Sequence, residues 1–314
     1  MFKYKEVIII LVVIFIAGCA STGGSSFFNR DKNSGFEEEI IFEGINGLEL
    51  AFLEGAPPKE VYQNSPFDIV LEMHNNGALD IVKGTAKLGI SLLFDVDDTT
   101  KSFQTIMGKE NFQLGETAQI RWDGIDLKRT AIRKDSTENI NVQVCYEGGT
   151  LAQPEVCVRP RPGKPGVLDG GCTVGEKSVS GGQGGPIAIT KILDNDVREQ
   201  GDSNVITFRI QVENVGGGDV INKGEVDDCK LSARDKQEAR IDIQVGWLDG
   251  TEFECNRNTD GKLVMNNGKG LITCVSSAVP NDQHYSTPLN IKMNYGYVDS
   301  IKTSLTVKKD AFIS

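Results

Sequence analysis

The cysteines are the residues of this chain whose chemistry is easiest to interpret. There are seven in 314 residues, and Cys19 stands apart near the N-terminus. The remaining six are an even number, which in an exported chain indicates a disulfide framework. Zinc would be the alternative use, but the sequence has no C-x-x-C, and its two histidines lie far from any cysteine. The candidate disulfide cysteines are Cys145, Cys157, Cys172, Cys229, Cys255 and Cys274.

The pairing of these cysteines cannot be chosen from sequence alone. Proximity along the chain favours one bridge between two strand-like runs in the first half and another within the second half. The two cysteines left over would then pair by default. We therefore expect the pairs Cys145–Cys157, Cys255–Cys274 and Cys172–Cys229.

The segment before Cys19 has the features of a secretory signal. Lys3 and Lys5 give a positive start, and an unbroken apolar run follows from Val7 to Ala17. This run is too short for a membrane-spanning helix, which needs roughly 20 apolar residues. Small residues then lead to the cysteine. We therefore expect residues 1–18 to be a signal peptide that is removed on export.

The stretch Ile16-Ala17-Gly18-Cys19 resembles the lipobox of bacterial and archaeal lipoproteins. The resemblance implies that Cys19 becomes the first mature residue and carries a lipid. Two hydrocarbon chains on that residue would give stable anchoring. The expected location is therefore extracytoplasmic, lipid-anchored to the cell membrane. Residues 19–38 are rich in Ser, Gly, Asn and charged residues, which predicts a flexible tether.

The remaining reactive side chains match no catalytic pattern. The sequence contains no G-x-S-x-G, P-loop, H-E-x-x-H or G-x-G-x-x-G motif. His74 ends an alternating strand among its polar positions, and His284 lies in a polar stretch, so both are expected to face solvent. Asp95, Asp97 and Asp98 have the oxygen density that calcium favours but lack EF-hand spacing, so a solvated loop is expected. We expect no enzymatic activity and no cofactor.

The net charge of −11 bears on partners rather than on fold. An acidic surface keeps an exported protein soluble and argues against nucleic acid or anionic lipid as a partner. The chain is long enough for about two domains of ordinary size.

Apolar residues alternate with polar ones along most of the chain, which predicts half-buried strands. The proline-rich stretch Arg159–Gly166 interrupts them because proline donates no backbone hydrogen bond. One short helix is plausible at 228–240. Strands are expected at 48–52, 67–73, 87–93, 119–122, 140–144, 155–158, 187–192, 205–212, 241–245, 271–275, 289–293 and 301–307.

An internal repeat is the most informative pattern. The alternating strand that ends at Asn75-Asn76-Gly77 has a counterpart that ends at Asn214-Val215-Gly216, 139 residues later. The run Ile140–Tyr146 has a counterpart in Leu289–Tyr295, 149 residues later. Asn and Gly tolerate left-handed backbone, so each Asn-x-Gly predicts a sharp turn after a strand. The repeat therefore predicts a duplicated domain.

These strand and turn motifs, with Gln113-Leu114-Gly115-Glu116, resemble the CARDB-like immunoglobulin-like modules of archaeal and bacterial surface proteins. The resemblance implies an all-β fold of two tandem immunoglobulin-like β-sandwich domains, after an N-terminal signal/lipobox helix and a flexible tether. We expect the domains at 39–160 and 186–309, joined by a Pro/Gly-rich linker at 161–185.

The expected function is that of a membrane-anchored cell-surface lipoprotein. It would act as a structural or adhesion module that binds another surface protein or an envelope component. The alternative is an extracytoplasmic accessory subunit that binds a carbohydrate or another small ligand. Tyr295 and Tyr297 fall between two expected strands, where an exposed pair on a turn would suit binding. Trp122 and Trp247 share the register of apolar residues and are expected in the core.

Overall fold

The computed structural model describes most of the chain beyond residue 42. Residues 41–314 form one compact unit. The expected signal peptide, Cys19, the tether and residues 161–171, 173 and 174 of the expected linker lie outside the described residues. Within the described part, no helix is long and apolar enough to span a bilayer. The described residues are 43–63, 65–111, 114–128, 134–158, 172, 175–201, 203–233, 237–256, 260–280 and 285–309.

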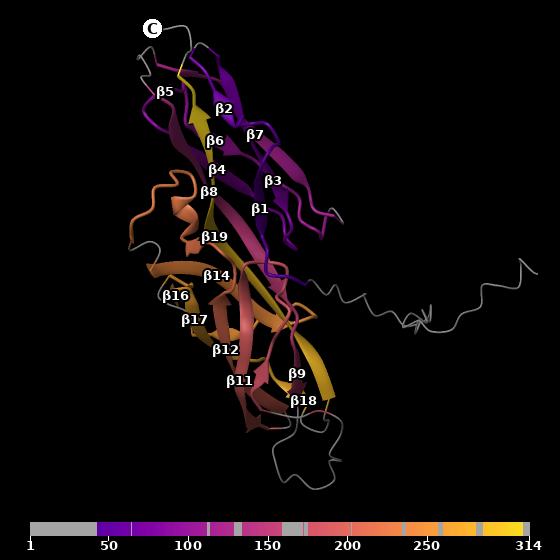
Figure 1. Ribbon diagram of the computed structural model, residues 1–314. Helices are drawn as coiled ribbons and strands as arrows, with labels where there is room; N and C mark the ends of the chain where they lie inside the picture. Colours follow the sequence, from indigo (N-terminus) through magenta and orange to yellow (C-terminus); the bar gives the residue numbers. More distant parts are fainter. Residues whose placement is uncertain are drawn as a thin grey trace, which may run out of the picture. The chain divides into compact units, whose positions relative to one another are not determined.

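The first half of the chain builds a sandwich of two antiparallel sheets (Figure 1). One sheet has the order β1 (Leu48–Phe52), β3 (Phe67–Asn75), β7 (Thr117–Leu127) and β5 (Phe94–Asp95). The other has the order β6 (Thr100–Phe103), β4 (Lys83–Gly89), β8 (Ser136–Ala152) and β19 (Tyr285–Val307). The short strand β2 (Glu60–Val61) lies parallel to the end of β19.

The second half repeats this architecture. One layer contains β11 (Ile187–Gln200), β12 (Ser203–Asn214) and β17 (Lys269–Val275). The other contains β16 (Leu263–Asn266), β14 (Glu238–Trp247), β19 and β9 (Glu155–Val158), and a tight turn links β16 to β17. Short additions are β10 (Lys177–Ser178), β13 (Asp219–Ile221), β15 (Glu254–Cys255), β18 (Val279–Pro280) and the 3-10 turn η1 (Lys223–Glu225).

The strands form because apolar side chains alternate with polar ones, so one face of each strand can be buried. Along β3 the residues Phe67, Ile69, Leu71 and Met73 are buried, and β12 repeats the pattern. One continuous apolar core joins residues of both halves. The prediction of an all-β fold of the sandwich type is confirmed.

The two halves share their longest strands, which the sequence pattern did not predict. β8 has 17 residues and β19 has 23, and they pair antiparallel from Ser136↔Val307 to Ala152↔Ile291. The first part of β19 also pairs with β14, while the first part of β8 also pairs with β4. Each half therefore has its sheet extended by the end of the other half's long strand (Figure 1). The contiguous ranges 39–160 and 186–309 do not contain every strand of the sandwich that each one builds.

The repeat extends to individual hydrogen bonds. In the first copy, Asn75 Oδ1 accepts from the backbone N–H of Gly77 at 2.9 Å, and Asn75 Nδ2 donates to the carbonyl of Leu79 at 3.1 Å. In the second copy, Asn214 makes the same two bonds, with Gly216 at 3.2 Å and Gly218 at 2.8 Å. Each Asn side chain therefore substitutes for backbone pairing at the end of its strand.

The glycines of these motifs are required for a reason other than the one predicted. Neither Gly77 nor Gly216 has the positive φ of a left-handed turn. A Cβ at Gly216 would instead lie 2.5 Å from the Tyr297 hydroxyl and 2.6 Å from Cβ of Pro186. Close approach of neighbouring groups, rather than backbone conformation, excludes a side chain there.

Gly115, in the predicted Gly-Glu turn, needs both a positive φ and open space. Its φ is +76°, and a Cβ would overlap the carbonyl oxygen of Asn75. We expect Gly115→Ala to lower the free energy of unfolding by about 3 kcal/mol or more, because backbone strain and a steric clash add. The matched control is Gly124→Ala, where φ is +64° but no atom lies within 4 Å of the new Cβ. It should cost about 1 kcal/mol. If urea unfolding showed the same loss of stability for both variants, a steric clash at residue 115 would be contradicted.

The structure contains three disulfides, and their pairing corrects two of the three expected bridges. Cys255–Cys274 forms as predicted, whereas the pairs Cys145–Cys157 and Cys172–Cys229 are wrong. The observed bridges are Cys145–Cys229 and Cys157–Cys172. The physical reason is that β8 continues past the first sandwich, which separates Cys145 from Cys157. Three disulfides are typical of a protein in an oxidising, extracytoplasmic compartment.

The expected helix at 228–240 is also corrected at its end. Ala233 and Gln237 are helical, as expected, but β14 already begins at Glu238. The 3-10 turn η1 lies before the expected helix. Residues 234–236 lie outside the described part of the chain.

Candidate functional site

Tyr295 and Tyr297 are not an exposed pair on a turn, as predicted, but lie in the interior. Each is 1% exposed, and β19 passes through Gly296 without turning. The strand continues because residues on both sides of Gly296 remain paired with β8. A Cβ at Gly296 would lie 2.8 Å from the carbonyl oxygen of Asn222, so glycine here permits close packing rather than a turn.

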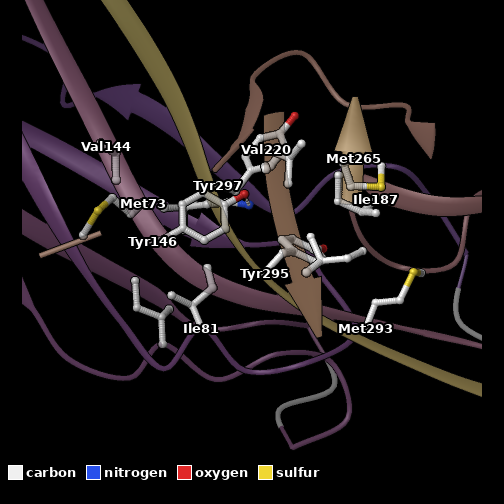
Figure 2. Close-up of a cluster of buried hydrophobic side chains, with 14 of the residues drawn as sticks. Met73, Ile81, Val144, Tyr146, Ile187, Val220, Met265, Met293, Tyr295 and Tyr297 are labelled. Carbon is white, nitrogen blue, oxygen red and sulfur yellow. Dashed lines mark hydrogen bonds between the residues drawn. The ribbon is translucent and has the colours of Figure 1, made fainter. Parts of the chain in front are cut away.

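The two tyrosines join Tyr146 in a cluster where β8 crosses from one half to the other (Figure 2). The ring centroids of Tyr146 and Tyr297 are 5.7 Å apart, and those of Tyr295 and Tyr297 are 6.4 Å apart. The Tyr297 hydroxyl accepts from the N–H of Gly218 at 2.9 Å and donates to Asn214 Oδ1 at 3.1 Å. Buried tyrosines normally find such partners.

Tyr295 and Tyr146 occupy equivalent positions in the two copies, but their hydrogen bonding differs. The Tyr295 hydroxyl accepts from the backbone N–H of Ile187 and is 2.8 Å from Thr150 Oγ1. The Tyr146 hydroxyl accepts from the N–H of Leu48 at 3.4 Å. Among the described residues, no acceptor receives the proton of the Tyr146 hydroxyl.

Burial of this cluster predicts a loss of stability at alkaline pH. Burial raises the pKa of Tyr297 to about 12, and the pKa values of Tyr146 and Tyr295 are raised for the same reason. An unfolded tyrosine ionises near pH 10, so between about pH 10 and 12 the unfolded state binds fewer protons and stability falls as pH rises. We expect the urea midpoint to change little between about pH 7 and pH 10 and to fall above pH 10.

Tyr297→Phe isolates the contribution of Tyr297, and the urea midpoint of this variant should decrease less above pH 10. The exposed Tyr62 provides the control, since Tyr62→Phe should leave the fall unchanged. A midpoint that stays constant up to pH 12 in the unsubstituted chain would contradict the assignment.

A surface hollow of about 320 Å³ lies next to this cluster. It is bounded by the segment before β1, by the Asn214–Gly218 turn and by the middle of β19. Its lining includes Asn46, Glu49, Tyr146, Gly217, Tyr297 and Asp299. We call it the tyrosine hollow.

Asp299 is the charged group of the tyrosine hollow with the most unusual surroundings. Burial raises the pKa of its carboxyl, and the nearby negative charge of Asp219 acts in the same direction. The N–H of Ser300 donates to Asp299 Oδ1 at 2.7 Å, but no Lys or Arg in the described residues forms an ion pair with it. A partly buried carboxylate without a cation is a candidate binding group.

Two further hollows are open and lie in the second half. One, of about 570 Å³, is lined by β16, β17 and neighbouring residues, including the exposed Leu271. The other, of about 500 Å³, lies beside Trp247 and Tyr285. Trp247 itself packs against Phe253, with a centroid distance of 4.8 Å, and Trp122 is 1% exposed. Trp122 therefore lies in the core, as predicted, whereas Trp247 is partly buried and packs against the core.

The predicted calcium candidates are exposed. Asp95 is in β5, and Asp98 uses Oδ1 to accept from the N–H of Thr100 at 2.9 Å. Across the described ranges, Asp95, Asp97 and Asp98 are not part of any group of three or more Asp, Glu, His or Cys arranged for a metal ion. His74 Nδ1 lies 2.9 Å from Thr117 Oγ1 on the neighbouring strand. His284 lies outside the described residues.

A polar clamp missed by the sequence analysis fastens the second half to the first. Lys83 Nζ, on β4, contacts both carboxylate oxygens of Asp227, at 2.7 and 2.8 Å, and lies 3.3 Å from Glu147. Next to it, Gln143 Nε2 donates to the carbonyl of Cys229 at 3.0 Å. The disulfide Cys145–Cys229 closes the same contact covalently.

Comparisons with known proteins leave the family of this chain open. No family model matches the chain, and no curated protein matches it. Among solved structures, one similar chain is a serine-rich repeat adhesion glycoprotein from Streptococcus agalactiae. It is 8% identical, the match covers 84% of this chain and 96% of that one, and the TM-score is 0.17. A likeness at this level carries no argument about function.

Proposed function

We propose that this protein is an extracytoplasmic binding or structural module, held at the cell membrane by a lipid on Cys19. The observation that carries the proposal is the exchange of β8 and β19 between the two sandwiches, together with the clamp at Asp227 and Cys229. Paired along 17 residues and cross-linked, the halves cannot move independently as two domains on a flexible linker would.

A rigid unit of this kind suits the presentation of surface loops and hollows to another macromolecule, because little conformational entropy is lost when a preorganised surface binds. The three disulfides support an oxidising location outside the cytoplasm. The short basic start, the apolar run and Cys19 support export and lipidation. The partner we propose is a surface protein or an envelope component.

Cell fractionation with Cys19→Ser tests the anchor. The unsubstituted chain should remain with the membrane fraction, and the variant should be released, because the two hydrocarbon chains supply the stable attachment. An Ala20→Ser variant controls for a general defect in export. Tight membrane association of Cys19→Ser would contradict the lipid anchor.

Proximity labelling on intact cells tests the binding role. The anchored chain should label a reproducible surface partner, and the released Cys19→Ser chain, added at the same concentration, should label the same partner. If only the anchored chain labelled neighbouring proteins and the released chain labelled none of them, the labelling would reflect proximity at the membrane, and a binding module would be contradicted.

A further inference from the structure

The tyrosine hollow differs from its counterpart in the repeat, and that difference indicates a ligand. In the other copy, Gly184 and Gly185, the counterparts of Ile45 and Asn46, pack against the residues equivalent to those of the hollow. The carbonyl of Gly184 accepts from the N–H of Ala78 at 2.7 Å. A Cβ at Gly185 would overlap Thr150 Oγ1 and lie 2.8 Å from the Tyr295 hydroxyl, so the main chain packs closely there.

In the tyrosine hollow, the groups equivalent to Ala78 N–H and to the Tyr295 hydroxyl lack such hydrogen-bond partners. Gly217 takes the place of Ala78, and its N–H has no hydrogen-bond partner among the described residues. Tyr146 takes the place of Tyr295, and the proton of its hydroxyl has no acceptor there, although Tyr146 is 2% exposed. Asp299 takes the place of Thr150 and brings a carboxylate that forms no ion pair with a Lys or Arg of the described residues.

We propose that the tyrosine hollow binds a short extended peptide segment of a partner protein, with a lysine or arginine placed against Asp299. The proposal rests on the binding role proposed above and names the chemistry of the partner. Two unused donors, the N–H of Gly217 and the O–H of Tyr146, match the carbonyl oxygens of a peptide main chain. The filled counterpart shows that main chain fits a site of this form.

The charge of the hollow selects the basic side chain. Glu49 and Asp299 both line it, and Asp219 lies close enough to raise the pKa of Asp299. A cation beside Asp299 would form a charge-assisted hydrogen bond in a partly buried site, where such bonds are strongest. A volume of about 320 Å³ admits a few residues rather than a folded domain.

The test follows the amide signal of Gly217 by NMR in the full exported chain carrying Cys19→Ser. The probe is the acetylated and amidated pentapeptide Thr-Val-Lys-Val-Thr, and the comparison probe has Glu in place of Lys. We expect a saturable shift with the lysine peptide only. Asp299→Asn should weaken binding about tenfold, as loss of a partly buried charge pair does. The control Asp97→Asn removes an exposed carboxylate elsewhere and should leave binding unchanged.

Tyr146→Phe provides a second readout that keeps the ring and removes the unused donor, together with the oxygen that accepts from Leu48 N–H at 3.4 Å. It should weaken binding about threefold or more while the melting temperature stays close to that of the parent. The proposal is overturned if no saturable shift appears at Gly217, if both peptides bind equally, or if arginine amide alone binds as tightly as the peptide. None of these results would alter the fractionation of Cys19→Ser or the surface labelling, so the proposed function is judged separately.

Discussion

Replacing Cys145 and Cys229 together by alanine should lower the free energy of unfolding by roughly 4–5 kcal/mol. The bridge closes a segment with a sequence separation of 84, and the chain entropy that a disulfide removes from the unfolded state grows with loop length. Both cysteines are buried, and the bridge fastens the second half onto the sheet of β4, β8 and β19. Urea unfolding of the oxidised protein measures the loss.

The matched control is the double replacement of Cys255 and Cys274 by alanine. That bridge has a separation of 19 and lies within one half, so roughly 3 kcal/mol should be lost. A larger loss for the short bridge than for the long one would show that Cys145–Cys229 does not constrain the unfolded chain as argued.

Asn75→Ala should cost about 3 kcal/mol or more. The Asn75 side chain is 1% exposed and bonds three backbone groups, namely the N–H of Gly77 and the carbonyls of Leu79 and Ile106. Alanine would leave these groups without their partner, and each buried group left unpaired costs about 1–3 kcal/mol. Thermal and urea unfolding measure the effect.

The repeat provides the control, because Asn214 makes three equivalent or similar bonds, to Gly216, Gly218 and Tyr297, but is only partly buried. Water can replace its bonds more easily, so Asn214→Ala should cost less than Asn75→Ala. A larger cost at Asn214 would contradict the link between burial and the penalty.

Much of the fold could be predicted from local pattern. Alternation in Phe67–Met73 and in 205–212 identified two core strands, because burial of one face imposes a period of two. The repeat of Asn75 and Asn214 identified equivalent positions that make equivalent hydrogen bonds. The even set of cysteines after Cys19 indicated disulfides, and three are present.

The errors in cysteine pairing and at Gly296 share one cause, which is that sequence equivalence does not say which segment completes which sheet. Pairing cysteines by proximity failed because β8 runs on into the second half and places Cys145 against Cys229. Gly296 suggested a turn, whereas the chain remains extended through it. The alignment of Tyr146 with Tyr295 was the available signal, since a residue buried in one copy is expected to be buried in the other.

The tyrosine hollow could not be predicted because its parts come from distant segments. Asn46, Gly217 and Asp299 meet only when the two copies have exchanged strands. Its unused donors become visible only by comparison with the filled counterpart around Gly184.

Coincident unfolding of the two halves is the most direct test of the central claim, that shared strands make them one unit. The chain has two tryptophans, Trp122 in the first half and Trp247 in the second. Trp247→Phe leaves a reporter in the first half, and Trp122→Phe leaves one in the second. In each variant, the fluorescence transition in urea should coincide with the loss of far-UV circular dichroism. The claim that the two halves are one unit would be contradicted by two separate transitions, in which the tryptophan fluorescence of either variant changes while about half of the far-UV circular dichroism remains.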